Sequence, residues 1–217
     1  MGDLPVYDVV LLPPPGVAAR SVGLSEWCAA RAPVEFVLSE DRLYPHLSLF
    51  MATLDAEGCA QAVRRLEDIS GRTAAVELRG THFAGNEHGM FELFYGKTDA
   101  VVGLQEDVLA EIAPLRAGWR RRDPVGRELD SYRRIAPPAA VGNFERYGYD
   151  EVGDLFRPHI TMTRFQERGH GVDPESLPPV EDFSAVFGKL ALCVMGEHGT
   201  CTEIVSAHPL SQARTTV

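Results

Sequence analysis

The sequence predicts an α+β fold whose sheets are mainly antiparallel. Segments with the two-residue period of strands and segments with the 3.6-residue period of helices both occur, and they follow one another without a regular strand–helix–strand rhythm. Two of the strand-like segments begin with the same Pro-His pair. The 217 residues, 45% of them hydrophobic, can bury a sizeable core, so we expect a single domain over residues 1–217.

The first half of the chain contains strand and helix signals in turn. Apolar runs bounded by Pro, Gly or polar residues predict strands in residues 6–12, 34–39, 46–54, 73–84 and 89–96. Apolar residues at helical spacing predict helices in residues 16–32, 55–71 and 98–115. Asp55 is a suitable N-cap for the second of these helices, and Gly71 is a suitable stop.

The second half of the chain is less regular. Basic clusters followed by prolines and glycines indicate an irregular connection over about residues 116–154. A strand is predicted in residues 156–165. After a proline-rich linker, two further strands are predicted on either side of a turn at Gly196–Gly199.

Charge and composition limit the partners. At a net charge of −10 the chain would repel a long nucleic-acid duplex, so we expect no such partner, whereas a small anionic substrate could still enter a locally basic cleft. No apolar run reaches the length of a membrane span, and no secretory leader is visible. We therefore expect a cytoplasmic monomer that does not associate with membranes. The four cysteines include no C-x-x-C pair, so no zinc or redox motif is visible: Cys28, Cys59, Cys193 and Cys201.

The two strand-like segments that begin with Pro-His share a longer pattern. Residues 45–49 read PHLSL and residues 158–162 read PHITM, which is Pro, His, aliphatic, hydroxyl and apolar in both. Because side chains alternate along a strand, His46 and Ser48 point to one face, as do His159 and Thr161. Each strand therefore has an apolar back and a polar front, and the two fronts carry the same pair of groups.

A chance origin of this match is improbable. A single strand histidine is more often a satisfied core residue than a catalytic one, but two full copies of a five-residue pattern rarely arise by accident. The third His-x-Thr of the chain, at His198, contains a glycine and lies beside Gly196, which is typical of a hairpin turn. We therefore do not count His198 as a third copy.

These residues resemble the 2H phosphoesterase superfamily, which includes 2′,5′ RNA ligase-like proteins and cyclic phosphodiesterases. That family has two His-x-Thr/Ser motifs, one in each of two similar lobes, which face one another across a cleft. The resemblance covers nearly the whole chain. It implies two similar lobes of mainly antiparallel sheet with helices outside and an active cleft between them. Ser48 stands where threonine is more usual, and both side chains supply a hydroxyl.

The resemblance implies a metal-independent phosphoric diester hydrolase without a cofactor. Its substrate would be a 2′,3′-cyclic phosphate, an ADP-ribose cyclic phosphate, or a 2′,5′-phosphodiester of a small nucleotide or RNA end. Two imidazoles suit this chemistry, because a neutral one can accept a proton while a protonated one donates to the leaving oxygen. His46 and His159 are thus the expected catalytic pair, and Ser48 and Thr161 the expected phosphate-binding groups. Which histidine is the base stays open.

Three further residues are candidates for substrate contacts. Arg164 completes the His-x-Thr-x-x-Arg form often seen in the ligase-like branch, and the first motif has no equivalent arginine. In a regular strand Arg164 would point away from His159, so it reaches the cleft only through a bend or at the strand's end. Tyr44 and Phe50 could stack on a base, although aromatic residues beside a strand motif are more often core.

Two other functions are open on the sequence alone. One is RNA 2′,5′ ligation, which is the reverse chemistry. The other is a non-catalytic module that binds a nucleotide or RNA end.

A cluster of arginines in the connection could serve either as a basic lid or simply as a solvated loop: Arg120, Arg121, Arg122, Arg133 and Arg134.

Overall fold

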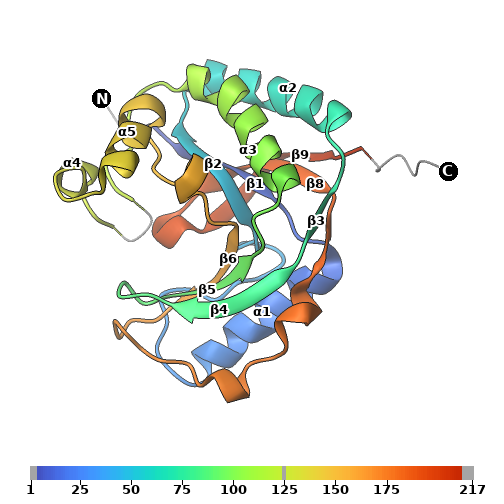
Figure 1. Ribbon diagram of the computed structural model, residues 1–217, viewed down its shortest axis with the longest axis vertical. Helices are drawn as coiled ribbons and strands as arrows, with labels where there is room; N and C mark the ends of the chain where they lie inside the picture. The colour runs from blue at the N-terminus through green and yellow to red at the C-terminus, as the bar shows by residue number, and fades with distance from the viewer. Residues whose placement is uncertain (1–3, 124–125, 212–217) are drawn as a thin grey trace.

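The computed structural model describes residues 4–123 and 126–211. Within these residues the strands form three sheets, and each pairing between named strands is antiparallel. Helices cover the outer faces of the two larger sheets (Figure 1). The predicted α+β class with mainly antiparallel sheets is therefore confirmed.

The first large sheet carries the first motif on its edge strand. Its strand order is β2-β1-β8-β9, so β2, which follows His46 directly, pairs only with β1 within the sheet. This order joins the N-terminal strand to two strands from the end of the chain. The bounds are β1 (Val6–Leu11), β2 (Leu47–Thr53), β8 (Lys189–Met195) and β9 (Cys201–Pro209).

The second large sheet carries the second motif, again on an edge strand. Its order is β4-β5-β6, with β6 beginning at His159. Strands β2 and β6 contact one another, so the two motif-bearing edges of the sheets meet. The bounds are β4 (Gly80–Gly85), β5 (Met90–Tyr95) and β6 (His159–Arg164), and a third, two-stranded sheet pairs β3 (Val76–Leu78) with β7 (Ala185–Phe187).

Three long helices close the apolar backs of these sheets. Helix α1 (Pro15–Ala29) packs on β6, whereas α2 (Ala56–Arg72) packs on β8 and β9 and α3 (Asp99–Ile112) packs on β2 (Figure 1). The Asp55 carboxylate accepts a hydrogen bond from the Gly58 amide and so caps α2 as predicted. The motif strands thus have their apolar residues buried under helices and their polar faces left for the cleft.

Both motif strands contain a β-bulge one residue after the motif hydroxyl. In β2, Ser48 pairs with Val10 and Phe50 with Val9, so Leu49 is the extra residue. In β6, Thr161 pairs with Glu92 and Thr163 with Phe91, so Met162 is the extra residue. A bulge reverses the alternation of side chains beyond it. The two strands therefore share a backbone irregularity as well as a sequence pattern.

The connection expected to be irregular contains two short helices in its described part. Helix α4 (Leu129–Tyr132) and helix α5 (Pro138–Tyr147) lie on one side of the molecule, beside the meeting edges of the sheets (Figure 1). Proline at the first position favours the start of α5, and Gly148, with φ of 71°, ends it. Turns of 3₁₀ helix precede and follow this region: η1 (Ala113–Leu115) and η2 (Gly153–Leu155).

Two of the predicted strands are wrong in detail. Residues 34–39 form no strand; Val34 makes a single bridge to Phe165, and this segment buries Phe36 and Leu38 while covering the end of β6. Residues 73–84 are not one strand but two, β3 and β4, which belong to different sheets. The strand is interrupted where the backbone of Gly80 passes close to that of Val180. A Cβ added to Gly80 would lie 2.4 Å from the Val180 carbonyl oxygen.

The linker after β6 contains two turns of 3₁₀ helix, η3 (Pro174–Ser176) and η4 (Val180–Phe183).

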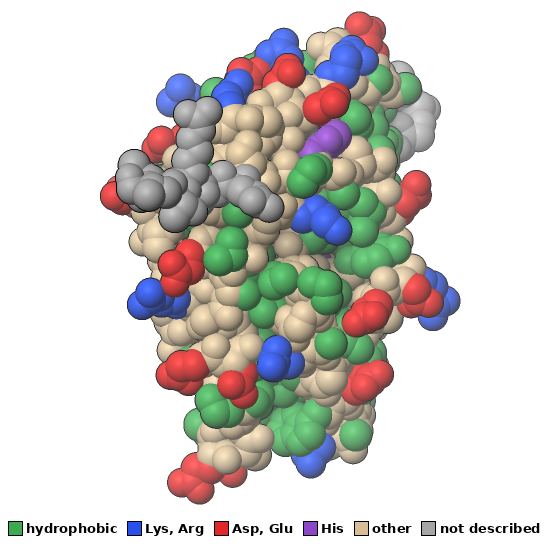
Figure 2. Space-filling model, turned by 90° about the vertical axis from the view of Figure 1, so that its right-hand side faces the viewer, with side chains coloured by type: hydrophobic (Ala, Val, Ile, Leu, Met, Phe, Trp, Pro, Cys, Tyr) green, Lys and Arg blue, Asp and Glu red, His purple; other side chains and the backbone are tan. Residues whose placement is uncertain are grey.

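On the face opposite to α4 and α5, acidic, basic and hydrophobic side chains are interspersed (Figure 2). Among the described residues, each helix is too short or too polar to cross a membrane.

Candidate active site

The two motif histidines are held by the same backbone contact. His46 Nδ1 lies 2.8 Å from the Tyr44 carbonyl oxygen, and His159 Nδ1 lies 2.6 Å from the Arg157 carbonyl oxygen. A carbonyl oxygen can only accept, so each Nδ1 carries its proton. A neutral imidazole with its proton on Nδ1 has a free lone pair on Nε2. In this tautomer Nε2 can act as a general base.

One cavity of about 150 Å³ brings the four motif side chains together. His46 and Ser48 line it from the first sheet, and His159 and Thr161 line it from the second. The connection contributes to the remainder of the wall, which is rich in charged and polar groups: Arg120, Asp123, Arg127, Tyr149, Asp150, Glu151 and Arg157. The two sequence copies, far apart in the chain, therefore face a single small volume.

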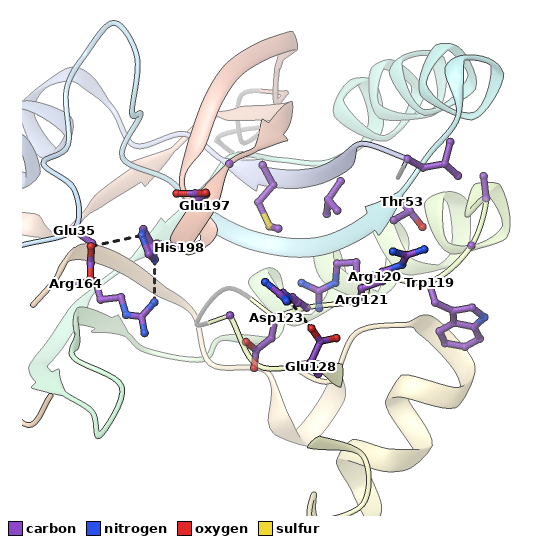
Figure 3. A pocket seen from close by; sticks show the side chains of 18 of the residues that line it. Glu35, Thr53, Trp119, Arg120, Arg121, Asp123, Glu128, Arg164, Glu197 and His198 are labelled. Carbon is purple, nitrogen blue, oxygen red and sulfur yellow. Dashed lines mark hydrogen bonds and ion pairs between the residues drawn. The ribbon is translucent and has the colours of Figure 1, made fainter. Parts of the chain in front are cut away.

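A larger groove of about 1,510 Å³ adjoins this cavity, and Arg164 lies in it (Figure 3). The cavity and the groove share three lining residues, Arg120, Asp123 and His198. The bulge in β6 accounts for the position of Arg164, because the extra residue changes which face the end of the strand presents. Arg164 Nε donates to the His88 carbonyl, and Nη1 lies 2.9 Å from His198 Nδ1.

His198 is part of the site although it lies in a turn. The turn is η5 (Glu197–Gly199), where His198 has a φ of 59°, in agreement with the hairpin predicted from Gly196 and Gly199. Because Arg164 can only donate, His198 Nδ1 is the acceptor of their bond. The sequence was thus sufficient to place the turn but not to show that its histidine side chain lines the cavity.

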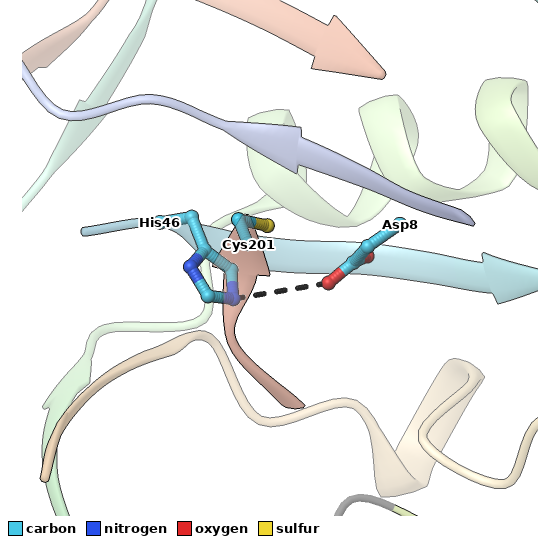
Figure 4. Close-up of side chains that lie close together, drawn as sticks. All are labelled: Asp8, His46 and Cys201. Atoms are coloured by element: carbon cyan, nitrogen blue, oxygen red, sulfur yellow. Dashed lines mark ion pairs between the residues drawn. The ribbon is translucent and has the colours of Figure 1, made fainter. Parts of the chain in front are cut away.

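Asp8, on β1, lies directly behind the first motif (Figure 4). Its side chain is 0% exposed, Ser48 Oγ donates a 2.6 Å hydrogen bond to its Oδ2, and His46 Nε2 lies 3.9 Å from the same oxygen. Burial raises the pKa of Asp8 to about 7, and the Ser48 hydrogen bond opposes this shift. Burial lowers the pKa of His46, which favours its neutral form.

Glu92, on β5, has a similar relation to the second motif. It pairs with Thr161 across the sheet and is only 6% exposed. Its Oε1 lies 3.6 Å from His159 Nε2. Burial raises the pKa of Glu92, and the charge of His159 opposes that shift. Each motif histidine therefore has a buried carboxylate within 4 Å of its Nε2.

Asp8, His46 and Cys201 also have the composition of a metal site. One potential ligand atom from each lies within 4.8 Å of the others (Figure 4). Burial raises the pKa of the Cys201 thiol well above its usual value. Asp8 Oδ2 accepts a hydrogen bond from Ser48, and His46 Nδ1 is bonded to the Tyr44 carbonyl, so both residues already take part in the hydrogen bonding of the first motif.

Solved structures with this architecture include E. coli LigT and a protein described as a phosphoesterase. No protein-family model matches the chain, and no curated protein matches it in sequence. The apo form of Escherichia coli LigT matches at a TM-score of 0.58 and 14% identity, covering 97% of this chain and 100% of LigT. TT0787 of Thermus thermophilus matches at 0.61 and 15% identity, covering 96% and 100%. A protein described as a phosphoesterase matches at 0.59 and 14%, covering 96% and 99%.

The chain has the LigT fold. The resemblance to the 2H phosphoesterases, first seen in the two Pro-His segments, is thereby confirmed at the level of the fold.

Of the three candidate substrate contacts, Arg164 lines the adjoining groove, whereas Tyr44 and Phe50 line neither the groove nor the cavity. Phe50 is wrong as a candidate, because the bulge at Leu49 turns its ring into the core, where it is fully buried against Tyr149. Tyr44 packs against a small apolar cluster that contains Val10 and Cys201, and its hydroxyl donates to the Asp41 carbonyl. The Tyr44 main chain nevertheless matters, since its carbonyl fixes the His46 tautomer.

Sequence reasoning missed Asp8 and Glu92, and it named Arg120 only as one member of an arginine cluster; all three are buried polar residues. Asp8 interrupts an apolar strand in VYDVV, and Glu92 does so in MFELFY. A single carboxylate inside an apolar strand was the available signal, because it rarely stays buried without a partner. Arg120 gave no comparable signal among the other arginines of the connection.

Proposed function

We propose that this protein is a metal-independent phosphodiesterase that opens a cyclic phosphate on a nucleotide or RNA end, with His46 and His159 as its acid–base pair. The observation that carries the proposal is the matched tautomer of the two imidazoles. Each is bonded at Nδ1 to a carbonyl, which leaves both Nε2 atoms for a group in the shared cavity. Two such nitrogens on either side of one phosphate suit in-line attack and departure.

The proposed reaction starts with a water molecule that attacks phosphorus. His46 Nε2 takes a proton from this water, and His159 Nε2–H gives a proton to the ribose oxygen as its bond to phosphorus breaks. The product is a nucleoside monophosphate, and the two histidines have exchanged protonation states. We assign the base to His46 because burial lowers its pKa and keeps it neutral. His159 is then the acid.

The hydroxyls of Thr161 and Ser48 bind non-bridging phosphate oxygens in this scheme. Thr161 lines the cavity beside Glu92. Ser48 gives its proton to Asp8 Oδ2, so while Asp8 is ionised Ser48 offers only lone pairs to an anion. Protonation of Asp8 lets Asp8 donate to Ser48 and releases the serine proton for the phosphate. We infer that phosphate binding and a proton on Asp8 favour one another.

The dimensions of the site support a nucleotide substrate. The cavity of about 150 Å³ is suited to a phosphate, and the adjoining groove of about 1,510 Å³ can take a nucleoside or a short chain. Structures of E. coli LigT have been determined with 3′-AMP, with NADP+ and with ATP. That a protein of the same fold binds nucleotides supports the same ligand class for this chain.

Two rival functions use the same cleft. RNA 2′,5′ ligation reverses the proposed reaction and needs the same histidines. A binding module for nucleotide ends needs the hydroxyls and an arginine but neither imidazole. Both histidines are held in the same tautomer, with Nε2 free to exchange a proton. This arrangement favours catalysis over binding alone, because binding requires neither that tautomer nor a neutral His46.

A substrate panel tests the proposal. Purified protein is incubated with 2′,3′-cyclic mononucleotides, ADP-ribose cyclic phosphate and 2′,5′-linked oligomers, and products are separated by chromatography. We expect turnover of at least one cyclic phosphate, and none by the folded H46A/H159A variant. Tight binding of several members without turnover would identify a receptor instead. Joining of RNA ends without hydrolysis would identify a ligase.

A further inference from the structure

Arg120 is a buried cation at the junction of the cavity and the groove. It is only 5% exposed, and it lines both volumes. In Figure 3 it lies toward the end of the groove near Thr53, away from the Arg164–His198 pair. A charged side chain that is this deeply buried normally has strong partners.

The hydrogen-bond partners of Arg120 are weak for a buried guanidinium, although its charge acts on the Asp8 and Asp150 carboxylates. Nη1 lies 3.3 Å from the Met51 sulfur, which is a poor acceptor, and the side chain lies 5.4 Å from the centre of the Tyr149 ring. Among the described residues, Arg120 Nε has no hydrogen-bond partner at all. A buried N–H of a cation without an acceptor is costly, so its presence beside a cavity points to an anionic ligand.

The contact with Met51 relates Arg120 to the second motif. Met51 stands three residues after Ser48, just as Arg164 stands three residues after Thr161. Both positions follow a bulge, at Leu49 and at Met162. The first motif thus has methionine at the position where the second has arginine, and the guanidinium of Arg120 lies against that methionine.

The surrounding chain holds Arg120 in place. The Ala117 amide donates to the Thr53 carbonyl at the end of β2, which ties the connection to the motif strand. The Arg116 guanidinium lies over the Trp119 ring, 4.1 Å from its centre. These contacts tie the segment that carries Arg120 to the end of β2, although Arg120 lies outside both motifs.

We propose that Arg120 binds a phosphate oxygen of the substrate and supplies, from the connection, the arginine that the first motif lacks. The inference rests on the proposed function, since it assumes a phosphate in the cavity. The ligand class is a phosphorylated nucleoside. The Arg120 guanidinium donates to the anion on the side of His46 and Ser48, and Arg164 lies on the side of the second motif.

Binding of a nucleoside 3′-monophosphate and of the unphosphorylated nucleoside tests this role. R120Q should weaken binding of the monophosphate by roughly 10- to 100-fold and leave the nucleoside unchanged, because a charge-assisted hydrogen bond to phosphate is lost. R120K keeps the charge but not the Nε donor, so we expect an intermediate loss. R146Q is the matched control: it removes the same charge from an exposed arginine of the connection that lies outside the arginine cluster, and it should change neither affinity.

A second measurement uses the wild type and does not depend on the folding of a variant. The Arg120 Nε–H resonance, assigned by its absence from R120K, should shift when the monophosphate is added and should not shift with the nucleoside. If the monophosphate binds and moves the histidine signals while R120Q binds normally and the Nε–H resonance stays still, the inference about Arg120 is overturned and the proposed function stands. If the wild type binds no monophosphate and turns over no cyclic phosphate, the proposed function fails with it.

Discussion

The Ser48 hydroxyl donates a 2.6 Å hydrogen bond to Asp8 Oδ2, and this carboxylate is fully buried. The bond joins the hydroxyl of the first motif, which we propose to bind phosphate, to a titratable group on the neighbouring strand. Thr161, its counterpart in the second motif, pairs with Glu92 in the same sheet. Both motifs therefore combine a hydroxyl, an imidazole and a buried carboxylate.

D8N should change how stability depends on pH. Burial raises the pKa of Asp8 from 3.8 to about 7, so the folded state holds this proton more tightly than the unfolded state. The resulting stabilisation is complete below pH 3.8 and is lost as the pH rises through 7. Relative to D8N, the wild type should therefore lose on the order of a few kcal/mol of unfolding free energy between pH 4 and pH 8.

Urea unfolding of both proteins across this pH range measures the effect. D68N is the control, because Asp68 is an exposed carboxylate on α2 and its substitution removes the same charge far from the motif strands. A constant difference between wild type and D8N would mean that Asp8 ionises in the folded protein as it does in water.

S48A and T161A should each raise KM and lower kcat. The hydroxyls bind the phosphate in both the ground state and the transition state, and a neutral hydrogen bond contributes about 1 kcal/mol. Steady-state kinetics on a cyclic nucleotide measures both constants. T163A is the matched control: its hydroxyl donates to the Phe36 carbonyl in the core, so its loss should lower stability and leave KM unchanged. An equal rise of KM in T163A would show that the effects come from strand packing.

The acid limb of the kcat/KM profile should lie below pH 6.5, the usual pKa of histidine. The free enzyme needs His46 neutral, and burial lowers the pKa of His46. Activity should therefore persist at a pH where an exposed histidine is already protonated. Measurement of kcat/KM from pH 4.5 to 9 in buffers of constant ionic strength checks this, and an acid limb clearly above the usual histidine pKa would argue against His46 as the base.

Activity should survive chelation. Proton transfer by two imidazoles and hydrogen bonds from two hydroxyls need no metal ion. Turnover is measured after dialysis against EDTA and again after addition of zinc or manganese. Abolition by EDTA with recovery on adding metal would refute the two-histidine mechanism and direct attention to Asp8, His46 and Cys201.

The motif strands were predictable because strand periodicity is a local property. Alternation alone places His46 with Ser48 and His159 with Thr161, and the shared pattern indicates one cleft. The bulges were not predictable, since an extra residue in a strand is defined by its partner across the sheet. For this reason the sequence left the position of Arg164 open and allowed Phe50 as a surface residue.

The carboxylates and Arg120 depend on contacts far apart in the chain. Asp8 approaches Ser48 only because β1 pairs with β2, 40 residues later in the sequence. Arg120 meets Met51 only because the connection folds back on the end of β2. Tertiary contacts of this kind leave no periodic signal in one sequence, so the second half of the site required the structure.

The most direct test is a double-mutant cycle on the two histidines with a cyclic nucleotide that the wild type hydrolyses. H46A and H159A should each lower kcat by about 100-fold or more, because each removes a proton-transfer group. The double variant should be scarcely slower than the slower single variant, since the two act as one unit, and circular dichroism should confirm that all three are folded. Nucleotide product affinity should change little. Folded variants that retain full turnover would contradict the account.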